Sequence, residues 1–212
     1  LGSDFTTLTV DGSGQRLTGN STTVAMPANT FNGNSSLVAV NDEVESCTSV
    51  GGYAFNLCTA ITTATLPLCT TVSDNAFQSC ESLTTATFNA CTSVGNNAFS
   101  GCTALTTATF NACTSVGNYA FGNCISLTTA TFNACTSVGN DAFVGCTSLA
   151  TVTLPLCADL GGTTGDDNVF LNISGQTITL TIAASRETCD GGNPDGDIVY
   201  LAANNTATII YV

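Results

Sequence analysis

Cysteine recurs in this chain at a constant interval. Eleven of the twelve cysteines are spaced eleven residues apart, and only Cys189 falls outside the series. An ordinary globular core does not repeat at a fixed interval, whereas a chain wound into similar coils returns equivalent side chains to equivalent places. The spacing therefore predicts a solenoid. The regularly spaced cysteines are Cys47, Cys58, Cys69, Cys80, Cys91, Cys102, Cys113, Cys124, Cys135, Cys146 and Cys157.

Two cysteine intervals make one repeat. Starting at every second cysteine, five 22-residue units follow one another over residues 47–156. The unit at 91–112 reads CTSVGNNAFSGCTALTTATFNA and divides into two related halves, each with Cys first, Thr second and Phe ninth. One coil is therefore expected to have two similar sides. An isolated repeat should not fold, because its apolar side chains are covered only by a neighbouring coil.

The second half of each repeat predicts a short strand. In the unit at 91–112, alternation directs Ala108 and Phe110 inward and Thr107 and Thr109 outward. The first half has Gly and Asn before an Ala-Phe pair, which predicts a short extended piece followed by a helical or 3-10 turn. The expected fold class is a mostly β repeat solenoid with a parallel strand ladder, short helical or 3-10 turns, and caps at both ends.

Stacking would sort the apolar side chains into columns. Equivalent residues of neighbouring coils should lie ~4.8 Å apart, the strand spacing of a sheet. Fully burying one such side chain is worth roughly 1.5–3 kcal/mol. The three expected columns are Phe55, Phe77, Phe99, Phe121 and Phe143; Ile61, Leu83, Leu105, Leu127 and Leu149; and Leu66, Phe88, Phe110, Phe132 and Leu154.

The N-terminal flank, residues 1–46, is expected to form a cap that contains one degenerate repeat. Met26, Phe31 and Leu37 reproduce the spacing of the apolar positions, although no cysteine is present there. The alternating segment 5–10 precedes an Asp-Gly pair, which predicts a strand and a turn that close this end of the stack.

The C-terminal flank, residues 157–212, is expected to hold a degenerate sixth repeat and a β cap. An interruption follows the last regular cysteine, and the alternating segment 176–182 predicts the strand of the sixth coil. Segments 198–201 and 207–212 predict further strands that cover the exposed edge, as the end of a solenoid requires.

The charge balance excludes several partner classes. The chain has two basic residues and fifteen carboxylates, which gives a formal net charge of −13. Such a chain repels polyanions and offers them almost no cationic contact, so nucleic acid and anionic membrane surfaces are poor partners. Residues 47–156 carry only Asp74, Glu81 and Asp141, so the repeats present hydroxyls and amides to water. No apolar run approaches the ~18–20 residues that span a bilayer, and no membrane insertion is expected.

The residue types also argue against an enzyme. The chain has no His, no Lys and no Trp, so the usual general base and Schiff-base residues are missing. A Ser-His-Asp or Cys-His site is therefore impossible, and the scattered carboxylates show no pair on a shared face. We expect no catalytic site and no cofactor.

The cysteine series invites a disulfide or metal interpretation. Side chains in one column point the same way from stacked coils, and two columns half a coil apart are poorly placed for bridging. The eleven-residue spacing also lacks the paired C-x-x-C of a zinc site. We expect reduced thiols that pack as small apolar groups and donate weak hydrogen bonds to turn backbone. Cys189 is the candidate for a free or variable thiol.

The segment around Asp190, Asp195 and Asp197 is a weak calcium candidate. Its carboxylates are the hard oxygen ligands that Ca²⁺ prefers. Their spacing does not match a known calcium loop, and the Gly, Asn and Pro residues among them are also typical of an exposed turn. Both interpretations stay open at this point.

The repeat resembles that of BspA-type leucine-rich-repeat proteins. The family unit is Val/Ile-Gly-x-x-Ala-Phe-x-x-Cys-x-x-Leu, and residues 94–105, VGNNAFSGCTAL, match it position for position. The match recurs through 47–156 and does not extend to the flanks. The resemblance implies a leucine-rich-repeat coil, a secreted or surface-attached location on bacteria or protists, and a non-enzymatic role in adhesion to host or partner macromolecules.

The outward threonines are the candidate ligand-binding residues. A Thr-x-Thr pair lies ~6.7 Å apart along a strand, and each pair should lie ~4.8 Å from the next. This uncharged lattice is similar to the ice-binding face of insect antifreeze solenoids, although Thr is also simply favoured on strands. The array comprises Thr63, Thr65, Thr85, Thr87, Thr107, Thr109, Thr129, Thr131, Thr151 and Thr153.

Three functional hypotheses follow. The first is an extracellular or cell-surface recognition and adhesion module that binds a glycan or protein through its strand face. The second is a phage tail-fibre or other virion component, displayed on the virion surface and attached to a larger assembly through its caps. The third, from a different class, is an ice-binding protein that uses the Thr-x-Thr array.

Overall fold

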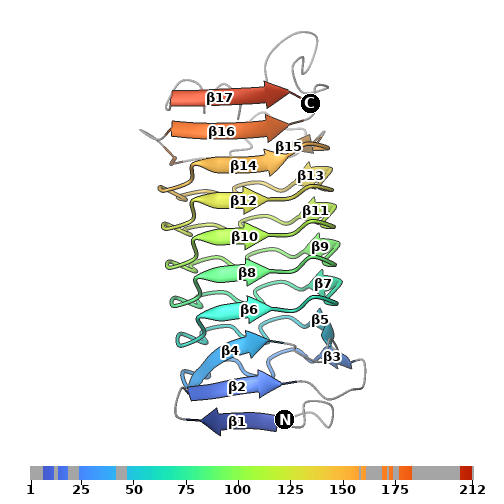
Figure 1. Cartoon of the computed structure of the whole chain (residues 1–212), viewed down its shortest axis with the longest axis vertical. Coiled ribbons are helices and arrows are strands. Elements are labelled where there is room, and N and C mark those ends of the chain that lie inside the picture. The colour runs from blue at the N-terminus through green and yellow to red at the C-terminus, as the bar shows by residue number, and fades with distance from the viewer. Residues whose placement is uncertain are drawn as a thin grey trace.

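The chain forms a stack of coils with two sheets running along it (Figure 1). The structure, a computed structural model, describes residues 7–11, 14–18, 24–41, 47–157, 159–160, 169–170, 172–173, 177–182 and 206–211. The larger sheet, sheet A, has ten strands. In spatial order these are β1 (Thr7–Asp11), β2 (Gly14–Thr18), β4 (Leu37–Asn41), β6 (Thr63–Thr65), β8 (Thr85–Thr87), β10 (Thr107–Thr109), β12 (Thr129–Thr131), β14 (Thr151–Leu154), β16 (Thr177–Ile182) and β17 (Thr206–Tyr211).

The smaller sheet, sheet B, has seven strands and is formed by the other half of each coil. Its strands are mostly two residues long, because the chain bends away into turns directly after the buried Val of each repeat. In spatial order they are β15 (Asp159–Leu160), β13 (Ser137–Val138), β11 (Ser115–Val116), β9 (Ser93–Val94), β7 (Thr71–Val72), β5 (Cys47–Val50) and β3 (Val24–Met26).

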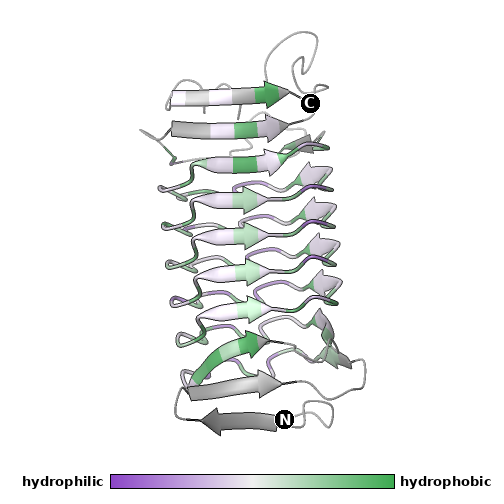
Figure 2. Cartoon of the chain, in the orientation of Figure 1, coloured by the Kyte–Doolittle hydropathy of each residue, from purple (hydrophilic) through white to green (hydrophobic). Residues whose placement is uncertain are grey.

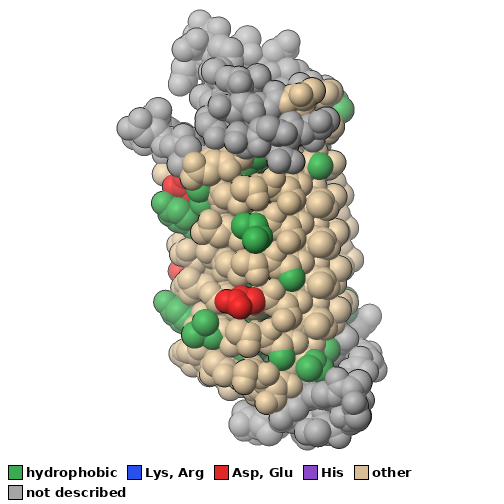
Figure 3. Space-filling view, turned by 90° about the vertical axis from the view of Figure 1, so that its left-hand side faces the viewer, with side chains coloured by type: hydrophobic (Ala, Val, Ile, Leu, Met, Phe, Trp, Pro, Cys, Tyr) green, Lys and Arg blue, Asp and Glu red, His purple; other side chains and the backbone are tan. Residues whose placement is uncertain are grey.

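The coils stack in parallel register with a step of one repeat. In sheet A, Ala108 pairs with Ala86 on one side and Ala130 on the other, and in sheet B Val116 pairs with Val94 and Val138. The repeats rise as a straight stack in two views at right angles (Figures 1 and 3). The predicted solenoid with its parallel strand ladder is therefore confirmed.

The turn side of the coil differs from the prediction. Ala98 N–H donates to the Gly95 carbonyl (3.4 Å) and Ser100 N–H donates to the Asn97 carbonyl (3.1 Å), as in successive β-turns. Asn97 (φ 54°) and Gly101 (φ 74°) adopt left-handed conformations, which interrupt a right-handed helix. The described residues contain no helix, so the expected helical or 3-10 turn is corrected to a series of β-turns.

These turns are also hydrogen-bonded from coil to coil. Phe77 N–H donates to the Ala98 carbonyl and Phe99 N–H donates to the Ala120 carbonyl, both at 2.8 Å. The turn side thus continues the ladder that the two sheets form elsewhere. Its backbone groups are paired as buried polar groups require, even though no strand is present there.

Phenylalanine rings fill the interior as two columns. Rings in the column of Phe55, Phe77, Phe99, Phe121 and Phe143 stack with centroids 4.9–5.5 Å apart. Phe88, Phe110 and Phe132 stack at 5.3 and 5.5 Å and meet the first column edge to face at 5.6–6.0 Å. Offset stacking and edge contacts are the favoured aromatic geometries. All three predicted columns are buried.

The same core continues into both flanks. Phe31 stacks on Phe55 at 5.5 Å and Phe170 stacks on Phe143 at 5.7 Å, which extends the ring column by one coil at each end. Near Phe31 the cysteine of the regular repeat is replaced by Asn34, whose Oδ1 accepts hydrogen bonds from the N–H groups of Ser36 (2.9 Å) and Leu37 (3.1 Å).

The outermost described strands lie where strands were predicted. β1 pairs antiparallel with β2, and β16 and β17 extend sheet A in parallel at the other end. Residues 198–201 lie outside the described residues. The division into caps at 1–46 and 157–212 around the repeats at 47–156 stays a prediction.

In four of the five repeats one glycine lies against the preceding coil. A Cβ on Gly117 would lie 2.7 Å from the backbone nitrogen of Asn96, and one on Gly51 would lie 2.6 Å from that of Ala28. Real Cβ atoms do not approach backbone so closely, so the coils would have to move apart. Ser73 takes this place in one coil, so a side chain here should lower stability without preventing folding.

Two adjacent glycines provide a matched test of this close approach. Gly51→Ala should lower the free energy of unfolding by about 1–3 kcal/mol, as overpacking does. Gly52→Ala should change it by less than about 0.5 kcal/mol, because its Cβ would meet only the Asp74 carbonyl oxygen at 3.4 Å. Urea denaturation of both variants measures the difference. Equal effects would show that coil spacing does not require the glycine.

Candidate functional site

The Thr-x-Thr pairs lie side by side on the outer face of sheet A. Thr107 and Thr109 are half-buried and flank Ala108, which is fully buried. Figure 2 shows the same pattern on each central strand, with an apolar residue between residues near the middle of the hydropathy scale. The predicted outward direction of the threonines is consistent with this alternation of burial. Whether they bind a ligand stays a prediction.

Strand register aligns these threonines into two rows along the stack. We call them the first and second Thr rows, and together the Thr face. The first row is Thr63, Thr85, Thr107, Thr129, Thr151, Thr179 and Thr208. The second row is Thr65, Thr87, Thr109, Thr131, Thr153 and Thr181.

Three members of these rows were not among the predicted site residues. Thr179 and Thr181 belong to β16 and Thr208 belongs to β17, beyond the regular repeats. The Thr-x-Thr pattern at 179–181 is visible in the sequence. Its pairing with β14 could not be predicted, because an irregular segment after Cys157 breaks the 22-residue spacing. The second row is one residue shorter than the first, because the residue of β17 that pairs with Thr181 is Ile210 and not a threonine.

The threonines just before the sheet A strands behave differently. The Thr106 hydroxyl donates to the Thr84 carbonyl at 3.0 Å, and the Thr128 hydroxyl donates to the Thr106 carbonyl at 3.0 Å. A carbonyl cannot donate, so the hydroxyl proton must lie between the two oxygens. These side chains are exposed, yet their single proton is used within the protein.

Charge is almost absent from the regular repeats. The carboxylates of Asp74 and Asp141 come from the turn half of the repeat, and that of Glu81 comes from the turn that precedes β8, so none of the three lies on a strand of sheet A. Figure 3 shows one face of the stack on which carboxylates and apolar side chains lie scattered among neutral polar groups. The carboxylate of Asp141 accepts a hydrogen bond from Tyr119 and raises the pKa of that phenol.

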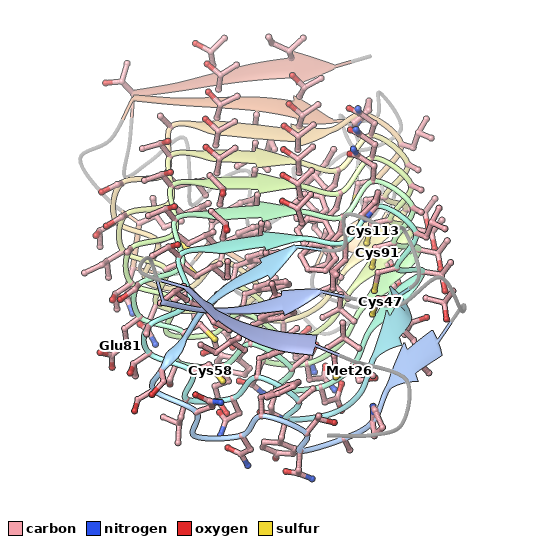
Figure 4. The ribbon with its side chains drawn as sticks, turned by 60° about the horizontal axis from the view of Figure 1, so that its bottom comes forward. Met26, Cys47, Cys58, Glu81, Cys91 and Cys113 are labelled. Carbon is pink, nitrogen blue, oxygen red and sulfur yellow. The ribbon has the colours of Figure 1, made fainter. Side chains whose placement is uncertain are left out.

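The eleven regularly spaced cysteines are all buried, and no disulfide joins them. They form two columns, one of which includes Cys47, Cys91 and Cys113 while Cys58 belongs to the other (Figure 4). The expected thiol hydrogen bonds are present: Cys102 Sγ donates to the Phe77 carbonyl and Cys113 Sγ donates to the Ser115 carbonyl, both at 3.1 Å. The predicted packing of these thiols as buried groups that donate hydrogen bonds to backbone is confirmed. Their reduced state stays a prediction.

Burial keeps the thiols of Cys58, Cys91 and Cys113 protonated. It raises the pKa of the Cys91 thiol from 9.0 to about 11 and the pKa values of the Cys58 and Cys113 thiols to about 12. Thiols of the unfolded chain ionise at lower pH, so the stability these groups contribute is fully present below pH 9.0 and lost as the pH rises toward 12. The thiolate is the nucleophile and metal ligand, so these cysteines are inert at neutral pH.

The remaining predicted site lies outside the described residues. Asp190, Asp195, Asp197 and Cys189 all belong to the undescribed segment 183–205, so the weak calcium candidate stays a prediction. Among the residues that the structure describes, no three metal-ligating side chains gather into a group. The described part of the chain also contains no helix long and apolar enough to cross a membrane.

A model of the BspA type leucine-rich repeat region matches residues 24–150 and 70–186, with six copies of the repeat. The match covers most of the chain and follows the coils described above. The chain belongs to the BspA type leucine-rich repeat family. Proteins with this repeat are generally surface or binding proteins. Membership also confirms the resemblance noted from residues 94–105.

Several solved structures of leucine-rich repeat proteins match the chain. A leucine-rich repeat protein of T. pallidum is 19% identical with a TM-score of 0.45, and the match covers 100% of this chain and 99% of that one. A leucine-rich cell surface protein of Faecalibacterium prausnitzii A2-165 is 16% identical with a TM-score of 0.40, covering 99% and 96%. A leucine-rich repeat protein from Bacteroides ovatus ATCC 8483 is 13% identical with a TM-score of 0.37, and the match covers 86% of this chain and 70% of that one. No curated protein matches the chain.

Proposed function

We propose that the protein is a non-enzymatic recognition and adhesion module, displayed outside the cell, that binds a surface glycan or protein through the Thr face. The observation that carries the proposal is the pair of in-register Thr rows on a straight, uncharged sheet. Within the described part of the chain the Thr107 and Thr109 hydroxyls make no hydrogen bond, so these hydroxyls can face a ligand. Family membership supports the surface location.

The form of the Thr face suits many weak contacts. Each coil offers a similar pair of hydroxyls. No charged side chain lies among them that could dominate the binding of a ligand. Repeated weak contacts along one rigid surface reach high overall affinity when the partner repeats as well. The expected partner is therefore an extended or repetitive surface polymer rather than a small molecule held in a deep pocket.

Filling the face with bulky side chains should abolish this binding. Replacing Thr107 and Thr109 together with Tyr should weaken binding to surface glycans or matrix proteins on an array by about ten-fold or more, because the partner loses contact with the central coils. The control replaces Ser115 and Ser137 with Tyr, since these residues occupy outward positions of sheet B. Binding that survives the Thr changes but fails in the Ser control would move the site to sheet B.

Ice binding is the second candidate, and a specific observation favours it. Ice recognition needs hydroxyls and methyls that reach one plane, and the repeats stack straight with their Thr rows in register (Figure 1). Strand geometry places these groups ~6.7 Å apart along a strand and ~4.8 Å apart between strands. The equal halves of the repeat supply the physical reason for low curvature.

A freezing-point-gap assay separates the two candidates. If ice binding is correct, the wild-type protein opens a gap and inhibits ice recrystallisation, and Thr107→Lys removes most of both effects by breaking the lattice with a charged side chain on a solvent face. Ser115→Lys on sheet B is the control and should leave both effects unchanged. A wild-type protein with neither effect would reject ice binding and leave the adhesion proposal standing.

Attachment to a virion or another assembly through the ends is the remaining alternative. It depends on segments such as 183–205 that the structure does not describe, and no described residue favours it. We therefore retain it only as the sequence-based hypothesis stated above.

A further inference from the structure

The Thr face is bordered by hydroxyls that can only accept hydrogen bonds from a ligand. Along this border each hydroxyl donates its proton to a main-chain carbonyl of the preceding coil at 2.9–3.0 Å. The oxygen lone pairs remain available, but no proton does. We call this set the acceptor row. It comprises Thr62, Thr84, Thr106 and Thr128, all of them exposed.

The acceptor row lies directly beside the first Thr row. Thr106 and Thr107 are consecutive, as are Thr84 and Thr85, so a ligand on the Thr face reaches both rows. No side-chain hydrogen bond is assigned to Thr85 or Thr107, and their hydroxyls can donate as well as accept. The combined surface therefore offers more acceptors than donors, and its ligand must supply the missing protons.

We infer that the Thr face binds an extended amino-sugar polymer, whose ammonium groups donate hydrogen bonds to the acceptor row. The inference rests on the proposed function and specifies its ligand. An ammonium group has three donors and no acceptor, which complements a row that only accepts. Hydrogen bonds from a charged donor are also about twice as strong as neutral ones.

The overall charge favours the same ligand. The chain has a net charge of −13, and its flanks carry most of the carboxylates while the repeats carry three. At low salt a cationic polymer is attracted by the net negative charge of the chain, most of it on the flanks, and it finds no basic side chain on the repeats to repel it. An anionic or sulfated glycan meets the opposite field and an acceptor row that cannot donate to it.

The spacing of the rows favours a sugar chain over a basic peptide. Equivalent hydroxyls recur every ~4.8 Å along the stack, so every second row member lies ~9.6 Å away. This distance is close to the two-ring repeat over which an extended β-1,4-linked sugar chain returns its amino groups to one side. An extended peptide returns a side chain to the same face every ~6.7 Å, so its cationic groups drift out of step with the coils. A rigid sugar chain in step with the coils can use every second row member.

The test uses two triple variants that lose the same internal hydrogen bonds. The first replaces Thr84, Thr106 and Thr128 with Val. The second replaces Thr92, Thr114 and Thr136 with Val. The latter three donate to preceding-coil carbonyls at 3.0–3.1 Å in the same way, but next to sheet B, where serines rather than a Thr row lie beside them. Both variants should therefore lose a similar amount of stability, and only their affinity for the ligand should differ.

Binding of a soluble glucosamine oligomer is measured by calorimetry for wild type and both variants, at low salt and at a mildly acidic pH that keeps the amino groups of the oligomer protonated. The wild-type protein should bind it at least about ten-fold more tightly than the fully N-acetylated oligomer. The first variant should lose about ten-fold in affinity and the second less than about two-fold. An equal loss in both variants would overturn the assignment to the acceptor row.

The other probes separate failure of the inference from failure of the proposed function. Tighter binding of the N-acetylated or of a sulfated oligomer overturns the inference and keeps a glycan-binding Thr face. If oligolysine binds as tightly as the glucosamine oligomer, positive charge alone explains the binding, and this result also overturns the inference. No binding of any oligomer, together with an empty glycan and protein array, overturns the proposed function itself.

Discussion

Stacking of one coil on the next in register is the interaction on which the rest of the structure depends. Backbone groups pair from coil to coil in sheet A, in sheet B and along the turns, as with Ala108, Val116 and Phe99. Each coil therefore satisfies its polar backbone groups only through its neighbours, and its apolar side chains are covered only by the next coil. Stability in such an array comes mainly from the interfaces between repeats.

The same register makes the inside and the outside periodic. Within the stack it aligns rings at centroid distances of 4.9–5.5 Å in the long Phe column. On the surface it aligns hydroxyls into rows with a pitch fixed by the backbone. The core and the candidate binding surface are thus two results of one repeated geometry. This explains how a chain with so few charged residues in its repeats presents an ordered, repetitive surface.

The sequence predicted what depends on period and polarity. The eleven-residue spacing of cysteine and the alternation around Ala108 were enough to predict the coil, the buried columns and the outward threonines. The turns were mispredicted because left-handed conformations occur at Asn97 and also at Tyr119 (φ 54°), a residue type that gives no such signal. Thr179 was missed because an irregular segment separates it from the repeats. The use of the Thr106 proton depends on a contact 22 residues away and needed the structure.

Deletion of chain segments tests the central claim that one 22-residue coil is the structural unit. Removing residues 91–112 should leave a cooperatively folded β protein whose longest dimension, measured by small-angle X-ray scattering, is shorter by about 4.8 Å. Removing residues 91–101 preserves the eleven-residue cysteine spacing but exchanges strand and turn halves in every later coil, and should prevent folding. A half-coil deletion that folds as well as the whole-coil deletion would contradict the account.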